Sequence, residues 1–444
     1  MKKQIRPIIC IVTMLFVIVG SLYYPYAKEQ SRIKSNEVRE QRVEEYAEVV
    51  ADSINAEDGD IILINTSTTS SKFATKVAEK CYQRGADGVK LLYNDRALLN
   101  LQAKYHKDFS YEGYFYNYML FKYEPSVMPE HKIIKIVSNN FSENQPTQTD
   151  LIKFRQTLDP LINEIKQKHN FDSTKTTTTD LPMWTMVPYP EESWATKVYP
   201  ELDKEAAFNK MLDDFLDFAH TGQDENFLEH CEKLTQLAKK ATDLDIVELH
   251  YKSKTADLHV PLHENQVFTG GLATNKEGKK YFPNIPTEEI FTMPSKYGAS
   301  GTVTTTRPFI FRNQLVEELR MTFEKGKMVD YSVKQGADVI ETLIKESPEG
   351  IYLGEAAIVS AKSPIFQSKK IYYEILIDEN SGAHIALGNA LSDYSLKAGA
   401  KIDENVNVAD YHIDVTIGSE DLTVTATLRD GSQVDILKNG KWNI

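Results

Sequence analysis

The sequence predicts an α/β N-terminal domain with βαβ units, followed by a mixed α+β, strand-rich C-terminal domain that binds metal. Three observations support this prediction. Residues 60–93 have the pattern of a strand, a helix and a second strand, which is typical of a parallel pair. From about residue 245 the helical spacing gives way to short apolar segments separated by turn residues. Acidic residues and histidines stand isolated inside several of those segments.

The N-terminal elements follow from the spacing of apolar residues. Val43, Tyr46, Val49, Val50 and Ile54 recur at helical intervals and predict an amphipathic helix. No G-x-G-x-x-G pattern follows the first strand, so the sequence does not support a dinucleotide site. The elements expected after that helix are strand 60–65, helix 71–84, strand 89–93, strand 133–137 and helix 150–169.

The second half of the chain changes from helices to strands. Residues 173–180 are rich in threonine and predict a loop or tether. The elements expected after the loop are helices 204–218 and 226–241, which pack as a pair, and strands 246–251, 258–262 and 302–305. We place the divisions at 1–30 for an N-terminal membrane anchor or signal segment, 31–255 for the α/β domain and 256–444 for the metal-binding domain.

Length, charge and cysteine content narrow the class of protein. At 444 residues the chain has room for two domains, each with its own core. The net charge of −13 argues against nucleic acid as a partner, because phosphate binding needs a basic face. The three cysteines are Cys10, Cys81 and Cys231, with no C-x-x-C pair to hold zinc. Cys81 and Cys231 can form a disulfide or remain as two buried thiols, and the second interpretation is favoured.

The N-terminus predicts a membrane segment. Residues 7–27 carry no charge and follow Lys2, Lys3 and Arg6. A stretch of this length can span the hydrocarbon core of a bilayer, and the positive residues favour the cytoplasmic side. We therefore expect a single-pass cell-membrane protein with its main body outside the cytoplasm. The alternative is a cleaved signal peptide and a secreted protein.

Six residues in the last third of the chain have the chemistry of metal ligands. A carboxylate inside an apolar strand is costly unless a cation or a hydrogen bond compensates it. In a strand, His412 and Asp414 point to the same face, because side chains alternate with a period of two. Carboxylates and imidazoles together suit divalent transition metals. The six residues are Glu289, Glu355, Glu379, His384, His412 and Asp414.

The motifs around these residues resemble the metalloaminopeptidases typified by aminopeptidase T and aminopeptidase S. The resemblance runs from about residue 43 to the C-terminus and is strongest after residue 282. It is carried by P-T-E-E at 286–289, L-G-E at 353–355, D-E-N at 378–380, H-I-A-L-G at 384–388 and H-x-D at 412–414. The resemblance implies that all six residues named above are metal ligands and that Glu355 bridges two ions.

This resemblance implies a metal-dependent aminopeptidase that removes N-terminal residues by two-metal activation of water, with Glu355 as the catalytic residue. Its cofactors would be two divalent ions, Zn²⁺, Co²⁺ or Mn²⁺, and its partners short peptides with a free N-terminus. The resemblance also implies a homodimer. Glu288 is a candidate base or amine anchor.

The chain departs from the family pattern at one position. The family has an active-site tyrosine seven residues after the H-I-A-L-G histidine, and this chain has Leu391 there. Tyr394, three residues further on, is a candidate replacement. The departure keeps open the alternative of a non-catalytic descendant that binds metal or peptide.

Overall fold

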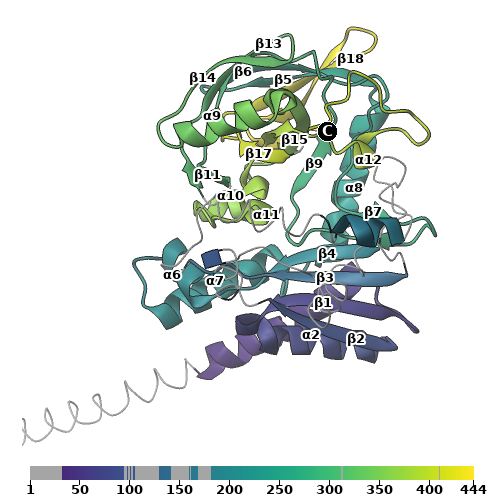
Figure 1. Ribbon diagram of the computed structural model, residues 1–444, viewed down its shortest axis with the longest axis vertical. Coiled ribbons are helices and arrows are strands. Elements are labelled where there is room, and N and C mark those ends of the chain that lie inside the picture. The colour runs from purple at the N-terminus through teal and green to yellow at the C-terminus, as the bar shows by residue number, and fades with distance from the viewer. Residues whose placement is uncertain are drawn as a thin grey trace, which may run out of the picture.

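The chain folds into a small parallel sheet with helices, joined to two further sheets that lie against each other (Figure 1). The computed structural model describes residues 33–94, 98, 101, 104–105, 130–141, 160, 162–168, 182–311, 314–409 and 411–444. This arrangement confirms the predicted fold class of an α/β part followed by a mixed, strand-rich part. The predicted domain boundary at 255/256 stays a prediction, and so does the homodimer.

The small sheet contains the predicted βαβ unit. Its four strands are all parallel, in the order β2-β1-β3-β4. They are β1 (Ile61–Ser67), β2 (Gly88–Asn94), β3 (His131–Val137) and β4 (Met183–Pro188). Helix α2 (Ser71–Gln83) joins β1 to β2 and buries Phe73 and Val77. The sequence patterns predicted β1, α2, β2 and β3 but not β4, whose segment is interrupted by prolines and tryptophan.

The helix over residues 33–53 begins well before the predicted start at residue 43. Its acidic residues face the basic residues of α2, with Lys80 Nζ lying 3.0 Å from Glu48 Oε1. The charged residues 33–42 therefore belong to the helix, because α2 supplies the opposite charges.

The largest sheet is antiparallel and has eight strands in the order β14-β13-β10-β6-β5-β18-β19-β20. They are β5 (Ile246–Lys252), β6 (Ala256–Pro261), β10 (Ser300–Thr304), β13 (Arg320–Glu324), β14 (Lys327–Ser332), β18 (Thr423–Leu428), β19 (Gln433–Lys438) and β20 (Lys441–Trp442). Four short strands form two separate two-stranded antiparallel sheets. β7 (Ala273–Thr274) pairs with β8 (Lys280–Tyr281), and β11 (Phe309–Phe311) pairs with β12 (Gln314–Val316).

A four-stranded sheet, which we call the ligand sheet, packs against the large sheet. Its order is β17-β16-β15-β9, and its strands are β9 (Glu289–Thr292), β15 (Leu353–Val359), β16 (His384–Gly388) and β17 (His412–Thr416). Ile358, Ile385 and Val415 share one hydrophobic core with Leu249 and Leu258 of the large sheet. Burial of these apolar residues fixes the face of each ligand-sheet strand, so the intervening residues point the other way.

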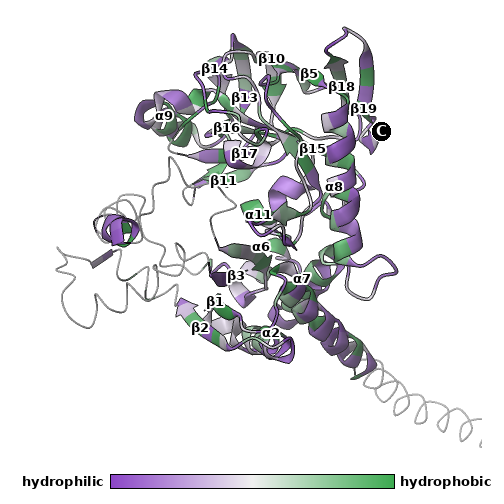
Figure 2. Ribbon diagram, turned by 90° about the vertical axis from the view of Figure 1, so that its right-hand side faces the viewer, coloured by the Kyte–Doolittle hydropathy of each residue, from purple (hydrophilic) through white to green (hydrophobic). Residues whose placement is uncertain are grey.

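The helices of the second half link the sheets. They are α6 (Glu192–Val198), α7 (Lys204–Phe218), α8 (Phe227–Asp243), α9 (Ala337–Glu346), α10 (Pro364–Ser368), α11 (Ile375–Asp378) and α12 (Ser392–Ser395). Helix α8 begins with a capping box between Asn226 and Glu229. Figure 2 shows α8 running from near α7 up to the large sheet, with mostly hydrophilic residues on the visible side. It therefore spans the small and large sheets.

The membrane predictions are corrected. The predicted span at 7–27 lies outside the described residues. Within the part of the chain that the structure describes, no helix is long and apolar enough to cross a membrane. A span needs about 20 predominantly apolar residues, whereas a described helix such as α8 carries a charged face. On this finding the predictions of a single-pass membrane protein with an extracytoplasmic body, and of a membrane partner, are wrong.

Cys81 and Cys231 are both free and buried, which confirms the interpretation as two thiols. Burial raises the pKa of the Cys81 thiol to about 12, so it stays protonated at neutral pH. Cys10 lies outside the described residues.

Trp194 connects α6 to the segment that leads into the ligand sheet. Its side chain is fully buried, and its indole N–H donates a hydrogen bond to the backbone oxygen of Tyr372. Phe215 of α7 packs beside it in the same apolar cluster. The cluster also contains Ile377, two residues before Glu379.

We expect Trp194→Phe to lower the free energy of unfolding by roughly 1–3 kcal/mol, because the Tyr372 carbonyl loses its buried donor. Urea unfolding followed by circular dichroism measures this difference. Trp442→Phe, on the half-buried edge strand β20, is the matched control and should cost less than about 1 kcal/mol. Equal losses in the two variants would contradict the structural role of Trp194.

Candidate metal centre

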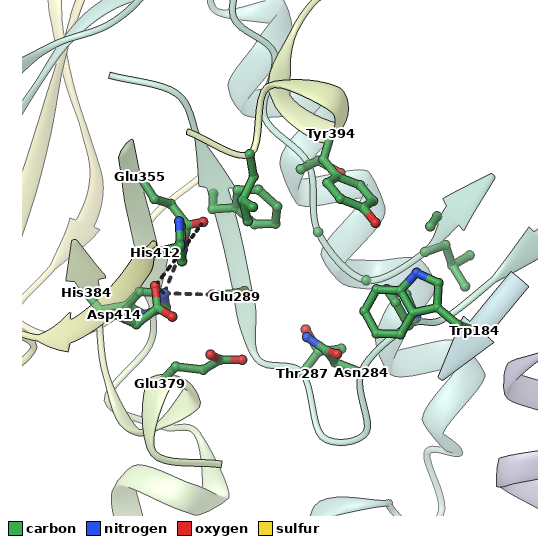
Figure 3. A pocket seen from close by; sticks show the side chains of 18 residues that line it. Trp184, Asn284, Thr287, Glu289, Glu355, Glu379, His384, Tyr394, His412 and Asp414 are labelled. Atoms are coloured by element: carbon green, nitrogen blue, oxygen red, sulfur yellow. Dashed lines mark hydrogen bonds and ion pairs between the residues drawn. The ribbon is translucent and has the colours of Figure 1, made fainter. Parts of the chain in front are cut away.

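A cavity of about 230 Å³ lies against the ligand sheet, and all six predicted ligands line it. Figure 3 shows Glu289, Glu355, His384, His412 and Asp414 gathered at one end, with Glu379 below them. The residues span 126 positions of the chain from Glu289 to Asp414, counted inclusively. Four strand segments and one 3₁₀ turn bring them together.

A β-bulge directs Glu355 into the cavity. Leu353 pairs with Leu387 while Glu355 pairs with Ala386, so Gly354 is an extra residue in β15. Leu353 consequently faces the apolar core, although it lies two residues from Glu355. A Cβ at Gly354 would lie 2.3 Å from the carbonyl oxygen of Asn389, so only glycine fits. The glycine of the L-G-E motif therefore determines the direction of Glu355.

Strand alternation places His384, His412 and Asp414 on the same face as Glu355. The intervening residues Ile385, Ile413 and Val415 belong to the core. Ala386 pairs with Glu355 on one side and with Asp414 on the other. The small side chain between the two carboxylates leaves the space in front of them open.

Each imidazole is oriented by its second ring nitrogen. His384 Nδ1 donates to the backbone oxygen of Gly382 at 3.3 Å, and His412 Nδ1 donates to that of Asn389 at 2.7 Å. Both Nε2 atoms are thereby turned toward carboxylates. Metal-binding histidines have this arrangement, since the backbone hydrogen bond fixes the tautomer and leaves the other nitrogen for the metal.

The ligand atoms form two overlapping groups around Glu355. His384 Nε2 lies 3.1 Å from Glu355 Oε1 and 3.0 Å from Glu289 Oε2. His412 Nε2 lies 3.5 Å from Glu355 Oε2 and 3.0 Å from Asp414 Oδ1. Within each group the ligand atoms lie within 4.8 Å of one another. Glu355 is the member that the two groups share.

The electrostatics of the centre depend on these contacts. Burial raises the pKa of Glu355, although the hydrogen bond with His384 opposes the effect. Burial also raises the pKa of Glu379 well above its usual range, and Asp414 adds to this. Burial lowers the pKa of His412, but Asp414 outweighs it and raises the value to about 10. The metal-free centre therefore holds protons that a bound cation would displace.

The residues present fit a divalent metal. None of the described residues that line the cavity is a lysine or an arginine, so the carboxylates have only two imidazoles as positive partners. Buried carboxylates without counter-charge are costly, and a divalent cation removes this cost. Oxygen and nitrogen donors suit Zn²⁺, Co²⁺ and Mn²⁺ without selecting among them.

Two acidic residues differ from the rest. Glu379 lines the cavity but belongs to neither of the two groups around Glu355. Glu288 is buried, and it does not line the cavity, because its neighbour Glu289 takes the inward direction in the strand. The cavity lining therefore does not support the expectation that Glu288 acts as a base or amine anchor.

Apart from Leu391 and Tyr394, the residues at the opposite end of the cavity were not predicted from the sequence. Figure 3 shows Trp184, Asn284, Thr287 and Tyr394 facing the ligand cluster across it. Trp184 comes from β4, the strand that the proline-rich pattern concealed. Leu391 also lines the cavity, three residues from Tyr394. The only sequence signal for this end was the position of the missing family tyrosine.

The comparison with known proteins points to one family. A profile described as thermophilic metalloprotease (M29) matches residues 39–442. Aminopeptidase AmpS of Bacillus subtilis is 26% identical over 90% of this chain and 98% of its own length. Aminopeptidase 2 of Geobacillus stearothermophilus is 29% identical over 91% and 98%. The resemblance found in the motifs is confirmed.

A solved structure shares the fold. Wild-type AmpT from Thermus thermophilus superimposes with a TM-score of 0.79, at 24% identity, covering 91% of this chain and all of that one. The agreement extends over both the small parallel sheet and the strand-rich part.

We expect His412→Ala and Asp414→Ala to lose bound metal, because each removes a ligand atom from the group around Glu355. His131→Ala, at the start of β3 in the small sheet, is the matched control and should keep the wild-type content. Elemental analysis of desalted protein gives the number of metal equivalents per chain. Equal content in all three variants would show that the centre does not bind the metal.

Ala386→Val should lower metal content without unfolding the protein. The added methyl groups would lie between Glu355 and Asp414, on the cavity face and away from the core. Ala383→Val, one residue before β16 and within the core, is the contrasting variant, which should lose stability through overpacking by roughly 1–3 kcal/mol. Unchanged metal content in the Ala386 variant would contradict the described geometry.

Proposed function

The chain belongs to the thermophilic metalloprotease family M29, and we propose that its buried centre uses two divalent metal ions to remove residues from the N-termini of peptides. Family membership makes the chain a metal-dependent aminopeptidase, a hydrolase that acts on peptides. The number of ions, their ligands and the role of each residue are the parts that we propose.

The observation that carries the two-metal proposal is the shared position of Glu355. Its Oε1 lies 3.1 Å from His384 Nε2 and its Oε2 lies 3.5 Å from His412 Nε2, and the groups that contain Glu289 and Asp414 share Glu355. A carboxylate with one oxygen directed at each ligand group can bridge two ions. Two ions that share a bridging carboxylate repel each other less than two ions without one.

We assign the six predicted ligands to this pair, with Glu379 completing the set from the 3₁₀ turn that follows α11. When bound, the ions would lower the pKa of a water molecule and polarise the scissile carbonyl group. The protein side chains position the ions, and the backbone oxygens of Gly382 and Asn389 hold the imidazoles in place. Glu355, buried between the imidazoles, is the catalytic residue of the proposal.

The cavity supports short peptides with a free N-terminus as substrates. Its volume of about 230 Å³ is below the roughly 300–1,000 Å³ of sites for drug-sized ligands, so it admits only a small end group. The excess of carboxylates favours the positive charge of a terminal ammonium group. Trp184 and Tyr394 offer aromatic surface for the side chain at the end opposite the ligands.

A second candidate function rests on Leu391. This residue lines the cavity where the family tyrosine is expected, and an aliphatic side chain cannot donate a hydrogen bond to a reacting group. A descendant that binds metal and peptide without hydrolysis would have this feature. Tyr394 supports the catalytic proposal instead, because it brings a phenol to the same cavity from the short helix α12.

We expect the metal-loaded protein to hydrolyse aminoacyl chromogenic substrates with a free amine and to leave their N-acetylated counterparts intact. Glu355→Gln should lower kcat/KM at least about 100-fold, because the bridging charge is lost. Tyr394→Phe should lower kcat if Tyr394 replaces the missing tyrosine. Chelation should abolish turnover, and added Zn²⁺, Co²⁺ or Mn²⁺ should restore it.

The two functions give opposite results in the same assay. Stoichiometric metal with no turnover of any free-amine substrate would contradict the catalytic proposal and support the binding protein. Leu391→Tyr then provides the matched gain-of-function variant, since it restores the family side chain at a position that already lines the cavity.

A further inference from the structure

Three side chains outside the catalytic centre meet on the other side of the segment that carries Glu289. We propose that His220, His230 and Glu288 form a separate metal site for a single divalent ion of the zinc class. His220 follows the end of α7, His230 lies in the first turns of α8, and Glu288 directly precedes β9. The ligand chemistry, two imidazoles and one carboxylate, is a common zinc set.

The geometry of the three side chains suits one ion. One ligand atom from each residue lies within 4.8 Å of the other two. His230 Nε2 and Glu288 Oε1 are 3.6 Å apart, close to the roughly 3.3 Å between ligand atoms of a tetrahedral zinc ion with bonds of about 2.0–2.1 Å. The rings of His220 and His230 have centroids 4.5 Å apart. Small side-chain rotations would bring all three ligand atoms to bonding distance.

Glu288 supplies the independent evidence that a ligand belongs here. Its side chain is only 8% exposed, and its Oε1 has no hydrogen-bond partner among the described residues. Its backbone N–H is held by Asn380 Oδ1 at 2.7 Å, which fixes the segment. A carboxylate so buried and directed at two imidazoles is costly without a cation. The proposed ion compensates this charge.

The histidines present nitrogen atoms to the same space. His220 Nδ1 donates to the backbone oxygen of Glu225 at 3.3 Å, which leaves Nε2 for a metal. His230 Nε2 also lies 2.9 Å from the backbone oxygen of Thr287, to which it donates when no metal is bound. Metal binding replaces that proton. A water molecule can complete four ligands.

The position of this site gives it a structural role. It would tie α7 and α8 to the residue directly before Glu289, a proposed ligand of the catalytic centre. An ion there would hold the start of β9 in place from the side opposite the cavity. The inference concerns metal binding alone and does not rest on peptidase activity.

Zinc counting on variants tests the proposal. Apoprotein is loaded with Zn²⁺, desalted and analysed for zinc per chain. We expect His230→Ala and His220→Ala to hold one equivalent fewer than the wild type, and His131→Ala to hold the wild-type number. The double variant His412→Ala/Asp414→Ala should retain at least one equivalent, because neither residue belongs to the proposed site. Equal zinc in the wild type and both His220 and His230 variants would overturn the proposal.

Histidine modification of the wild-type protein gives a second test that needs no variant. Diethyl pyrocarbonate modifies free imidazoles, and mass spectrometry locates the modified residues. Zinc should lower the modification of His220 and His230 at least tenfold and leave that of His131 unchanged. Equal modification with and without zinc would overturn the site. Failure of the catalytic centre would appear separately, as zinc retained in full by the His412→Ala/Asp414→Ala variant.

Discussion

The structure depends on one electrostatic constraint: four carboxylates and two imidazoles share a small cavity, and the described residues on its walls include no lysine or arginine. Glu355 and His384 are almost completely shielded from water. Such a concentration of negative charge is stable only with protons or cations beside it. Protonated histidines can supply part of the compensation in the metal-free protein, and divalent ions can supply all of it. Metal binding and the stability of the ligand sheet are therefore linked.

The sheet geometry meets this constraint with very few residues. Packing of the ligand sheet against the large sheet decides which face of each strand is apolar. The alternation of side chains along a strand then directs His384, His412 and Asp414 to the opposite face, and no bulge is needed. Glu355 needs the bulge at Gly354, because regular alternation with the core residue Leu353 would direct it into the core. The small residue Ala386 keeps the space between the carboxylates open.

Much of this centre could be predicted from the sequence because its predicted ligands lie in short motifs with recognisable chemistry. Alternation alone places His412 and Asp414 together, and the family motifs add the other four predicted ligands. The bulge at Gly354 could not be predicted, since a register shift depends on the partner strand. The strand β4 was hidden by prolines and tryptophan, so Trp184 could not be assigned to the cavity. The inward direction of Glu289 and the outward one of Glu288 depend on where β9 begins.

The cluster of His220, His230 and Glu288 could not be predicted from the sequence either. His220 and His230 stand in polar stretches, and nothing in their local pattern relates them to Glu288, more than fifty residues away. Only the packing of α7 and α8 beside the start of β9 brings the three side chains together. The membrane prediction relied on hydropathy at the N-terminus, and the described helices give it no support.

The central claim is that Glu355 holds two metal ions, one with His384 and Glu289 and one with His412 and Asp414. The most direct test is a crystal structure of the zinc-loaded protein with anomalous scattering measured at the zinc edge. The account predicts two peaks in the cavity, each about 2 Å from one oxygen of Glu355. A single peak, or two peaks of which neither is bonded to Glu355, would contradict it.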